Sequence, residues 1–289
     1  MNKFKYLKFG TCSWKYDSWK GIIYPETDKL NYLKEYSKHF KTVEIDQWFW
    51  SLFGEKIKLP SHKDVVEYNS SVPEDFKFTI KVPNSITLTH HYRKSKKDEL
   101  KPNPFFLSVE LYKEFLDSIS PMHSKIGMNM LQFEYLNKQK MSSQIEFLSR
   151  LKSFIQNIPG NIPIAIELRN PNYLNEIYFD FINEMNVFDV LLQGYYMPPI
   201  WDVYSKFRDK INGKVVIRLH GPNREEIENA SDGKWDKIIF QRDDELKNIV
   251  KILKDLESRK IDTYVNVNNH YEGSAPLTIQ RIQNLLMST

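Results

Sequence analysis

One short segment limits the possible folds of this chain more than any other: residues 215–221, Val-Val-Ile-Arg-Leu-His-Gly. Its β-branched, apolar start is typical of a buried strand, and its polar end leads into a proline. Residues two apart in a strand lie on the same face. Arg218 and His220 therefore share one face, while Ile217 and Leu219 share the other. We expect one face to pack in an apolar layer and the other to carry a charged site.

The same design recurs in other segments that are apolar at the start and polar on one face at the end. Their polar side chains are Glu44 and Asp46, Gln132 and Glu134, Glu167 and Arg169, and Asn266, Asn268 and His270. Such endings are expected where the carboxyl ends of many strands converge on one site.

Eight segments have the pattern of strands: residues 7–14, 42–46, 76–82, 126–134, 162–169, 188–193, 215–220 and 264–268. Helical patterns follow most of them: from Asp28, at 64–70 and 109–119, from Ser142 with Ile145 on its apolar face, from about Ile177 to Met185, from Asp243, and at 276–287. This alternation predicts parallel βαβ units, and eight of them predict an α/β fold, a (β/α)8 barrel of the TIM type. We expect one domain over residues 1–289. An open doubly wound sheet is the alternative, but no glycine-rich phosphate turn follows the first strand.

Composition excludes several classes of protein. The net charge of +4 is far from the concentrated charge of a dedicated nucleic-acid binder. A single cysteine, Cys12, excludes an internal disulfide framework and a multi-cysteine zinc site. No apolar run approaches the roughly 18 residues of a membrane span, so we expect no membrane association and a cytoplasmic location. The oligomeric state stays open.

Several motifs stand close to these strand ends: GTCSWKY at 10–16, TVEID at 42–46, FTIKVP at 78–83, LQF at 131–133, ELR at 167–169, RLHG at 218–221 and NNH at 268–270. Together they resemble the motifs of the DUF72 (YecE-like) family, over nearly the whole chain. The resemblance implies a TIM-type barrel and supplies no reaction. Cys12, Asp46, Glu134 and Asn170 differ from the residues usual in that family. We therefore expect the segments that follow the second and fourth strands to bind a different ligand.

The polar strand ends suggest a pocket for a small anionic ligand. Lys81, Arg169 and Arg218 are suited to a phosphate or carboxylate, with Glu44, Gln132 and Asn268 as further ligand-binding candidates. The alternative is a self-satisfied ion network that fills the barrel mouth, in which the two arginines only neutralise Glu44 and Glu167.

His220 is the best candidate for proton transfer because its ordinary pKa lies near neutrality, with Glu167 as its carboxylate partner or as an independent base. No cofactor is predicted. A divalent metal held by Glu44, Glu134, Glu167, His220 and His270 is an alternative, although no tight ligand spacing supports it.

Loop residues supply the remaining candidates. Trp14 and Tyr16 could stack on a sugar or base, although packing of loops onto the barrel is the simpler interpretation. His90 lies on a loop over the mouth as a ligand contact or plain surface. Cys12 is a small buried residue or, alternatively, a nucleophile. Residues 222–242 form a long connection that could act as a lid.

Two functions of different class follow. The first is an enzyme, a hydrolase, isomerase or lyase that acts on a small polar or anionic molecule by acid/base chemistry. The second is a binding protein without chemistry, with single-stranded nucleic acid held by the aromatic loops and by Arg93, Lys94, Lys96 and Lys97.

Overall fold

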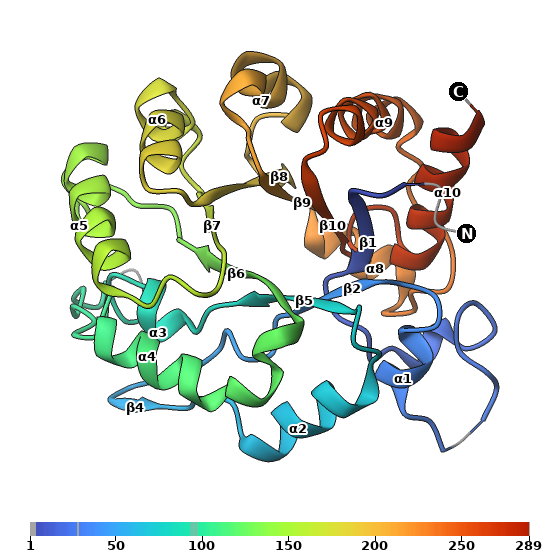
Figure 1. The fold of residues 1–289 in the computed structure, drawn as a ribbon, viewed down its shortest axis with the longest axis horizontal. Helices are drawn as coiled ribbons and strands as arrows, with labels where there is room; N and C mark the ends of the chain where they lie inside the picture. The colour runs from blue at the N-terminus through green and yellow to red at the C-terminus, as the bar shows by residue number, and fades with distance from the viewer. Residues whose placement is uncertain (1–3, 28, 94, 96, 289) are drawn as a thin grey trace.

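Eight parallel strands form a nearly closed barrel with helices around it (Figure 1). The structure is a computed structural model that describes residues 4–27, 29–93, 95 and 97–288. The barrel strands are β1 (Leu7–Thr11), β2 (Thr42–Ile45), β5 (Lys77–Lys81), β6 (Ile126–Gln132), β7 (Ile164–Glu167), β8 (Phe188–Gly194), β9 (Lys214–Gly221) and β10 (Asp262–Val267). They neighbour one another in the order β1-β10-β9-β8-β7-β6-β5-β2. The predicted (β/α)8 barrel is confirmed.

The helices are α1 (Tyr32–Tyr36), α2 (His62–Ser71), α3 (Asn84–Thr87), α4 (Val109–Ser118), α5 (Gln144–Asn157), α6 (Glu176–Glu184), α7 (Ile200–Phe207), α8 (Arg224–Ser231), α9 (Asp243–Ser258) and α10 (Ala275–Ser288). Short 3-10 turns are η1 (Asp17–Trp19), η2 (Ser120–Lys125), η3 (Pro171–Tyr173) and η4 (Arg208–Lys210). Within the described residues, none of the helices has both the length and the apolar character needed to cross a membrane.

Several helix predictions need correction at their starts. Asp28 lies outside the described residues, and α1 begins at Tyr32 after Asn31, whose side chain accepts a hydrogen bond from the Lys34 N–H. Helix α5 is capped by Ser143 instead of Ser142, because the Ser143 side chain accepts from Glu146 N–H.

Two isoleucines expected on buried helix faces are exposed. Ile145 in α5 is 72% exposed and Ile177 in α6 is 56% exposed. The buried face of α5 begins instead at Phe147, and that of α6 at Tyr178. Each prediction placed the apolar stripe too early in its helix, because an isoleucine in the first turn extended the pattern.

The sequence reading missed several short elements. It did not anticipate α3, α7 or the hairpin of β3 (Leu52–Phe53) and β4 (Lys56–Ile57). The connection at 222–242, expected to be a long loop, contains α8.

A tyrosine bridges the seam where the barrel would otherwise stay open. Within the described chain no strand ladder joins β1 to β2. The buried Tyr36 hydroxyl accepts from Thr11 N–H at 2.8 Å and donates to the Thr42 carbonyl at 3.0 Å. The strands also approach closely, since a Cβ added to Gly10 would lie 2.1 Å from the Thr42 carbonyl oxygen.

The barrel interior has two layers of different chemistry. A lower layer of buried apolar side chains consists of Met128, Met130, Ala165, Val190, Val216 and Tyr264. Above it, toward the carboxyl ends of the strands, lie Glu44, Thr79, Glu167, Arg218 and Asn266, all buried. The outer strand faces, including Ile217 and Leu219, pack into the main apolar core under the helices. The alternation predicted for residues 215–221 is therefore confirmed.

Candidate functional site

Arg218 is the centre of the polar layer. Its guanidinium binds Glu44 in a bidentate manner, with Nε 2.8 Å from Oε2 and Nη2 2.6 Å from Oε1. Nη1 donates to Glu167 Oε2 on the other side of the barrel. All three side chains are at most 1% exposed. Such a buried network is expected only when each charge is paired and hydrogen-bonded, which this geometry achieves.

Asn266, on β10, completes the coordination of Glu44. Its amide donates to Glu44 Oε2 at 3.3 Å and to Thr79 Oγ1 at 2.8 Å. Asn268, predicted to bind a ligand, does not join this network. Its side chain accepts from His270 N–H at 2.9 Å in a turn after the strand.

Arg169 is the second cation of the mouth and faces its open side. Its guanidinium donates to Glu167 Oε1 from Nε at 2.8 Å, and it is 3.4 Å from Gln132 Oε1, an oxygen that Arg218 also reaches. The Arg169 guanidinium carbon lies 4.6 Å from the centre of the Tyr195 ring. With a side chain 13% exposed, Arg169 is the more accessible of the two arginines.

Lys81 is the third cation, and its ammonium is not saturated. Nζ lies 4.0 Å from the centre of the Phe49 ring. Among the residues that the structure describes, none provides an ion pair or hydrogen bond to this ammonium. Burial lowers the pKa of Lys81, the neighbouring Arg218 lowers it further, and Glu44, Glu167 and Asp46 oppose the shift.

His220 lies between a thiol and a phenol. Its Nε2 is 3.6 Å from Cys12 Sγ and its Nδ1 is 3.2 Å from Tyr195 Oη. Burial lowers the pKa of His220 well below its usual value, and the charges of Arg218 and Arg169 lower it further. The imidazole is therefore neutral at neutral pH, and either neutral tautomer satisfies both contacts.

Cys12 has the properties of an unreactive buried thiol. The side chain is 4% exposed. Burial raises the pKa of Cys12 well above its usual value, and Glu44 raises it further. A thiolate is the nucleophilic form, so this environment does not favour the nucleophile alternative.

The pKa values of two carboxyl groups of the mouth are shifted in opposite directions. Burial alone would raise the pKa of Glu167, but the charges of Arg169, Arg218 and Lys81 lower it to about 2. Burial, followed by repulsion from Glu44, raises the pKa of Asp46 to about 6. Asp46 is thus a carboxyl group of the mouth whose pKa lies close to neutral pH.

Tyr195 is a site residue that the sequence reading missed. It follows β8 in the left-handed conformation, with φ of 54°. Its N–H donates to the Gly221 carbonyl at 2.9 Å. Gly221 itself has φ of 74°, and a Cβ added to Gly194 would lie 2.4 Å from the Gly221 carbonyl oxygen. The signal available in the sequence was the glycine that precedes the tyrosine at the end of a strand.

Other predicted residues lie around the network without joining it. Trp14 is buried against Tyr68, with ring centres 5.0 Å apart. Tyr16 packs on Trp19 at 4.7 Å, and it lines a narrow crevice that Asn268 also lines. His90 Nδ1 lies 3.0 Å from Thr89 Oγ1 on the segment after α3.

The residues of the metal alternative are dispersed. Glu134 pairs with Lys140, and His270 Nε2 lies 3.1 Å from Glu228 on α8. Glu44 and Glu167 are engaged by arginine. Over residues 4–288, apart from the undescribed positions, no three His, Cys, Asp or Glu side chains are grouped as metal ligands.

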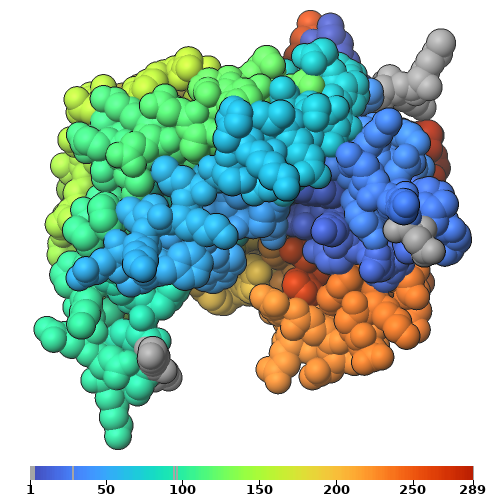
Figure 2. All heavy atoms as spheres, turned by 90° about the horizontal axis from the view of Figure 1, so that it is seen from below, coloured from blue at the N-terminus to red at the C-terminus, as the bar shows by residue number. Residues whose placement is uncertain are grey.

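The surface is hollowed near the mouth. The described residues of the segment after β5, 88–93, 95 and 97–105, and the segment around α8 project from one end of the molecule and leave a recess between them (Figure 2). Of the four basic residues suggested for nucleic acid, Lys94 and Lys96 lie outside the described residues. Arg93 Nη1 donates to the Asp98 carbonyl at 3.3 Å, and Lys97 lies on the same exposed segment.

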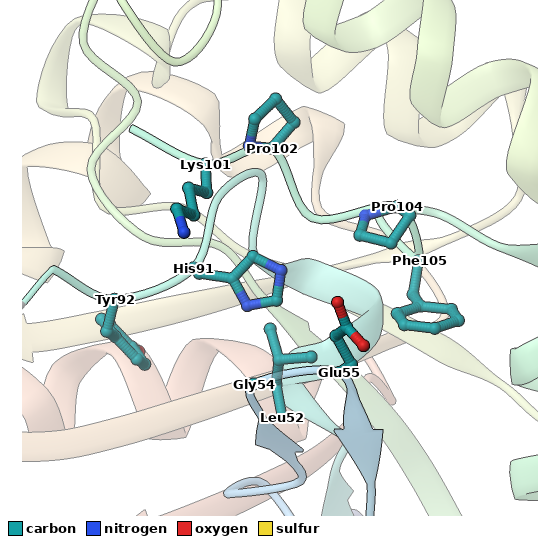
Figure 3. A pocket seen from close by; sticks show the side chains of 9 residues that line it. All are labelled: Leu52, Gly54, Glu55, His91, Tyr92, Lys101, Pro102, Pro104 and Phe105. Carbon is teal, nitrogen blue, oxygen red and sulfur yellow. The ribbon is translucent and has the colours of Figure 1, made fainter. Parts of the chain in front are cut away.

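Two sizeable cavities lie to the sides. One, of about 760 Å³, lies between the β3–β4 hairpin and residues 91–105, with His91, Glu55 and Phe105 around it (Figure 3). The other, of about 560 Å³, lies beside the carboxyl ends of β1 and β2, and Asp46 lines it. Only the second cavity includes a residue of the charged mouth.

Comparisons with known proteins agree on one family. The model of the family described as "Protein of unknown function DUF72" matches residues 8–289. UPF0759 protein YunF of Bacillus subtilis (strain 168) is 26% identical over 267 residues, which cover 88% of this chain and 86% of that protein. Among solved structures, a DUF72 family protein of Thermotoga maritima MSB8 has a TM-score of 0.67 at 22% identity and covers 98% of this chain and 100% of that one. A DUF72 family protein of Enterococcus faecalis V583 also has a TM-score of 0.67, at 20% identity, and covers 97% of this chain and 95% of that one.

Proposed function

The chain belongs to the DUF72 family, for which no activity or ligand is established, and from its barrel mouth we propose that it is an enzyme acting on a small molecule that bears a phosphate or carboxylate. The ligand's anionic group binds Lys81 and Arg169 at the carboxyl ends of β5 and β7. The chemistry is proton transfer, in a hydrolase, isomerase or lyase reaction.

The single observation that carries this proposal is the unsaturated ammonium of Lys81. A desolvated cation is costly unless it is paired, and Arg218 stands close enough to lower the pKa of Lys81. Among the described residues it has an aromatic ring beside it and no bonded anion. An oxyanion placed there would supply the missing partner.

Arg218, which the sequence suggested as a ligand-binding residue, has a different role in this proposal. Its guanidinium already binds both Glu44 and Glu167. We therefore assign it a positioning role, in which it fixes the strand ends. Arg169 is more accessible, and its contact with Glu167 and Tyr195 fixes its orientation before any ligand arrives.

The two groups first considered for proton transfer are not equally suited to it. His220 is neutral at neutral pH, which is the form that a general base needs, although the burial and the arginines that lower its pKa also make it a weaker proton acceptor. Glu167 has a pKa of about 2 and two arginine partners, so it stays ionised over the neutral range. Its suitable role is to orient Arg169 and Arg218.

Thermal unfolding in the presence of sulfate or phosphate tests the proposal, with chloride at matched ionic strength as the reference. A ligand at 100 times its dissociation constant stabilises the folded state by about 2.7 kcal/mol. We expect sulfate to raise the melting temperature of the wild type saturably and Lys81→Met to abolish that rise. Lys101→Met is the matched control, because Lys101 lines the other cavity. An equal rise in Lys81→Met and wild type would contradict the proposal.

Binding of single-stranded nucleic acid is a second candidate, favoured by exposed aromatic pairs near the strand ends. Trp50 and Tyr92 are 5.8 Å apart, Tyr135 and Tyr196 are 6.2 Å apart, and each is at least 50% exposed. Such rings can stack on bases. Salt-dependent binding of an oligonucleotide that weakens in Tyr135→Ala would support this candidate, and no binding at low salt would remove it.

A further inference from the structure

We infer that the cavity beside the carboxyl ends of β1 and β2 is a subsite for a polyhydroxylated group, such as a sugar ring. The inference rests on the proposed function and names its substrate class. The ligand is a sugar that carries a phosphate or carboxylate, with its hydroxyl groups in this cavity and its anionic group at Lys81.

The cavity has the dimensions of a small-molecule site. Its volume of about 560 Å³ falls within the roughly 300–1,000 Å³ typical of ligand pockets. Its walls come from the segments that follow β1 and β2, from the start of α1 and from α2. It therefore lies at the end of the barrel where the charged mouth also opens.

Hydrogen-bond acceptors predominate among its polar side chains. Three carboxyl groups line it, those of Asp46, Asp64 and Glu67, against one ammonium, that of Lys15. Within the described part of the chain, none of these carboxyl groups is held by an ion pair or by a side-chain hydrogen bond. Gln47 also lines the cavity and donates through Nε2 to Tyr68 Oη at 2.6 Å, which leaves its carbonyl oxygen available. A ligand that fits this cavity must supply several donors.

Hydroxyl groups meet this requirement better than a phosphate does. Each hydroxyl carries one donor, and two neighbouring hydroxyls of a sugar can donate to the two oxygens of one carboxylate. A phosphate in the same place would face three carboxyl groups and be repelled. The anionic part of the ligand therefore belongs on the Lys81 side.

An aromatic wall completes the site. The rings of Trp14 and Tyr68 are perpendicular, with centres 5.0 Å apart, and Trp48 stacks on Tyr68 at 5.7 Å. These contacts hold Tyr68 in place before a ligand binds, which reduces the entropy lost on binding. The apolar C–H face of a sugar ring can pack against such a wall while its hydroxyls meet the carboxyl groups.

Asp46 joins the subsite to the mouth. It follows β2 two residues after Glu44, which binds Arg218. Its carboxyl lines the cavity, and its backbone carbonyl accepts a hydrogen bond at 3.0 Å from the N–H of Phe49, whose ring centre lies 4.0 Å from Lys81 Nζ. One molecule can therefore contact Asp46 with a hydroxyl and Lys81 with its anionic group.

Isothermal titration calorimetry with inorganic phosphate, ribose 5-phosphate and glucose 6-phosphate tests the inference. We expect at least one sugar phosphate to bind about tenfold or more tightly than inorganic phosphate, a difference of about 1.4 kcal/mol, because its hydroxyl groups donate hydrogen bonds to charged carboxyl groups. Glu67→Gln and Asp46→Asn should each weaken that sugar phosphate about tenfold. Glu67→Gln should leave inorganic phosphate unchanged. Glu55→Gln, in the other cavity, is the matched control and should change neither.

The outcomes separate this inference from the proposed function. Phosphate binding that depends on Lys81, with no gain from the sugar and no effect of Glu67→Gln, overturns the inference and leaves the anion site standing. Absence of binding by phosphate and by both sugar phosphates overturns both. Putrescine that binds more tightly than butane-1,4-diol and depends on Glu67 makes the cavity an amine site, which also overturns the inference.

Discussion

Replacing Arg218 with methionine should destabilise the protein strongly. The substitution removes the cation that binds Glu44 in a bidentate manner, while Glu44 stays fully buried. Glu167 loses one partner and keeps Arg169. Breaking a buried ion pair from one side costs about 3–5 kcal/mol. With an entropy of unfolding of about 2.1 cal/mol/K per residue, 1 kcal/mol shifts the melting temperature of a chain of 289 residues by about 1.6 °C, so the melting temperature should fall by roughly 5–8 °C.

Urea unfolding followed by circular dichroism measures this loss, with Arg208→Met as the matched control. Arg208 also makes a bidentate contact, to Asp255, but its side chain is 44% exposed. Exposed pairs contribute about 0–1 kcal/mol, so the control should stay close to the wild type.

A double variant would identify Glu44 as the cause. Arg218→Met/Glu44→Gln should recover part of the lost stability, because it removes the unpaired buried charge. A loss below about 1 kcal/mol in Arg218→Met, or no recovery in the double variant, would refute the reasoning.

Three other groups give separate predictions. Asp189 is buried, and burial raises its pKa from 3.8 to about 7, so the free energy of unfolding should fall as the pH rises between these values. Urea unfolding of Asp189→Asn should show no such fall. Its free energy of unfolding should exceed that of the wild type by up to about 4 kcal/mol above pH 7 and by little near pH 4. A difference that does not change with pH would contradict the assignment. Tyr36→Phe should lose about 1–3 kcal/mol by the same measurement, because it leaves the seam groups of β1 and β2 unpaired, and an unchanged stability would show that the bridge is dispensable. Cys12 should react with a thiol reagent only as fast as the protein unfolds; rapid labelling of the folded protein would contradict its buried, protonated state.

The barrel and the direction of most polar side chains followed from the sequence because they depend on local rules. Period-two alternation correctly placed Arg218 inside and Ile217 outside. Alternation holds only while the backbone is extended, and this explains the errors. β10 ends at Val267, so Asn268 turns into a local hydrogen bond, whereas Asn266 within the strand reaches Glu44.

Other parts of the site depend on distant contacts that no local pattern contains. Tyr195 reaches His220 only because the ends of β8 and β9 approach closely at glycines. Whether the charged side chains at the strand ends form an open pocket or a saturated ion network also depends on how closely the closed barrel brings them together. The structure pairs Arg218 on both sides and gives Lys81 no bonded partner among the described residues. The saturated network therefore describes Arg218, whereas the open pocket is our proposal for Lys81.

The most direct test of the central claim is anomalous diffraction from crystals soaked in selenate, an analogue of sulfate. The account predicts an anomalous peak at the barrel mouth, within hydrogen-bond distance of Lys81 Nζ and beside Arg169, and its loss in Lys81→Met crystals. Selenate bound only at exposed lysines and arginines, with none beside Lys81, would contradict the anion site.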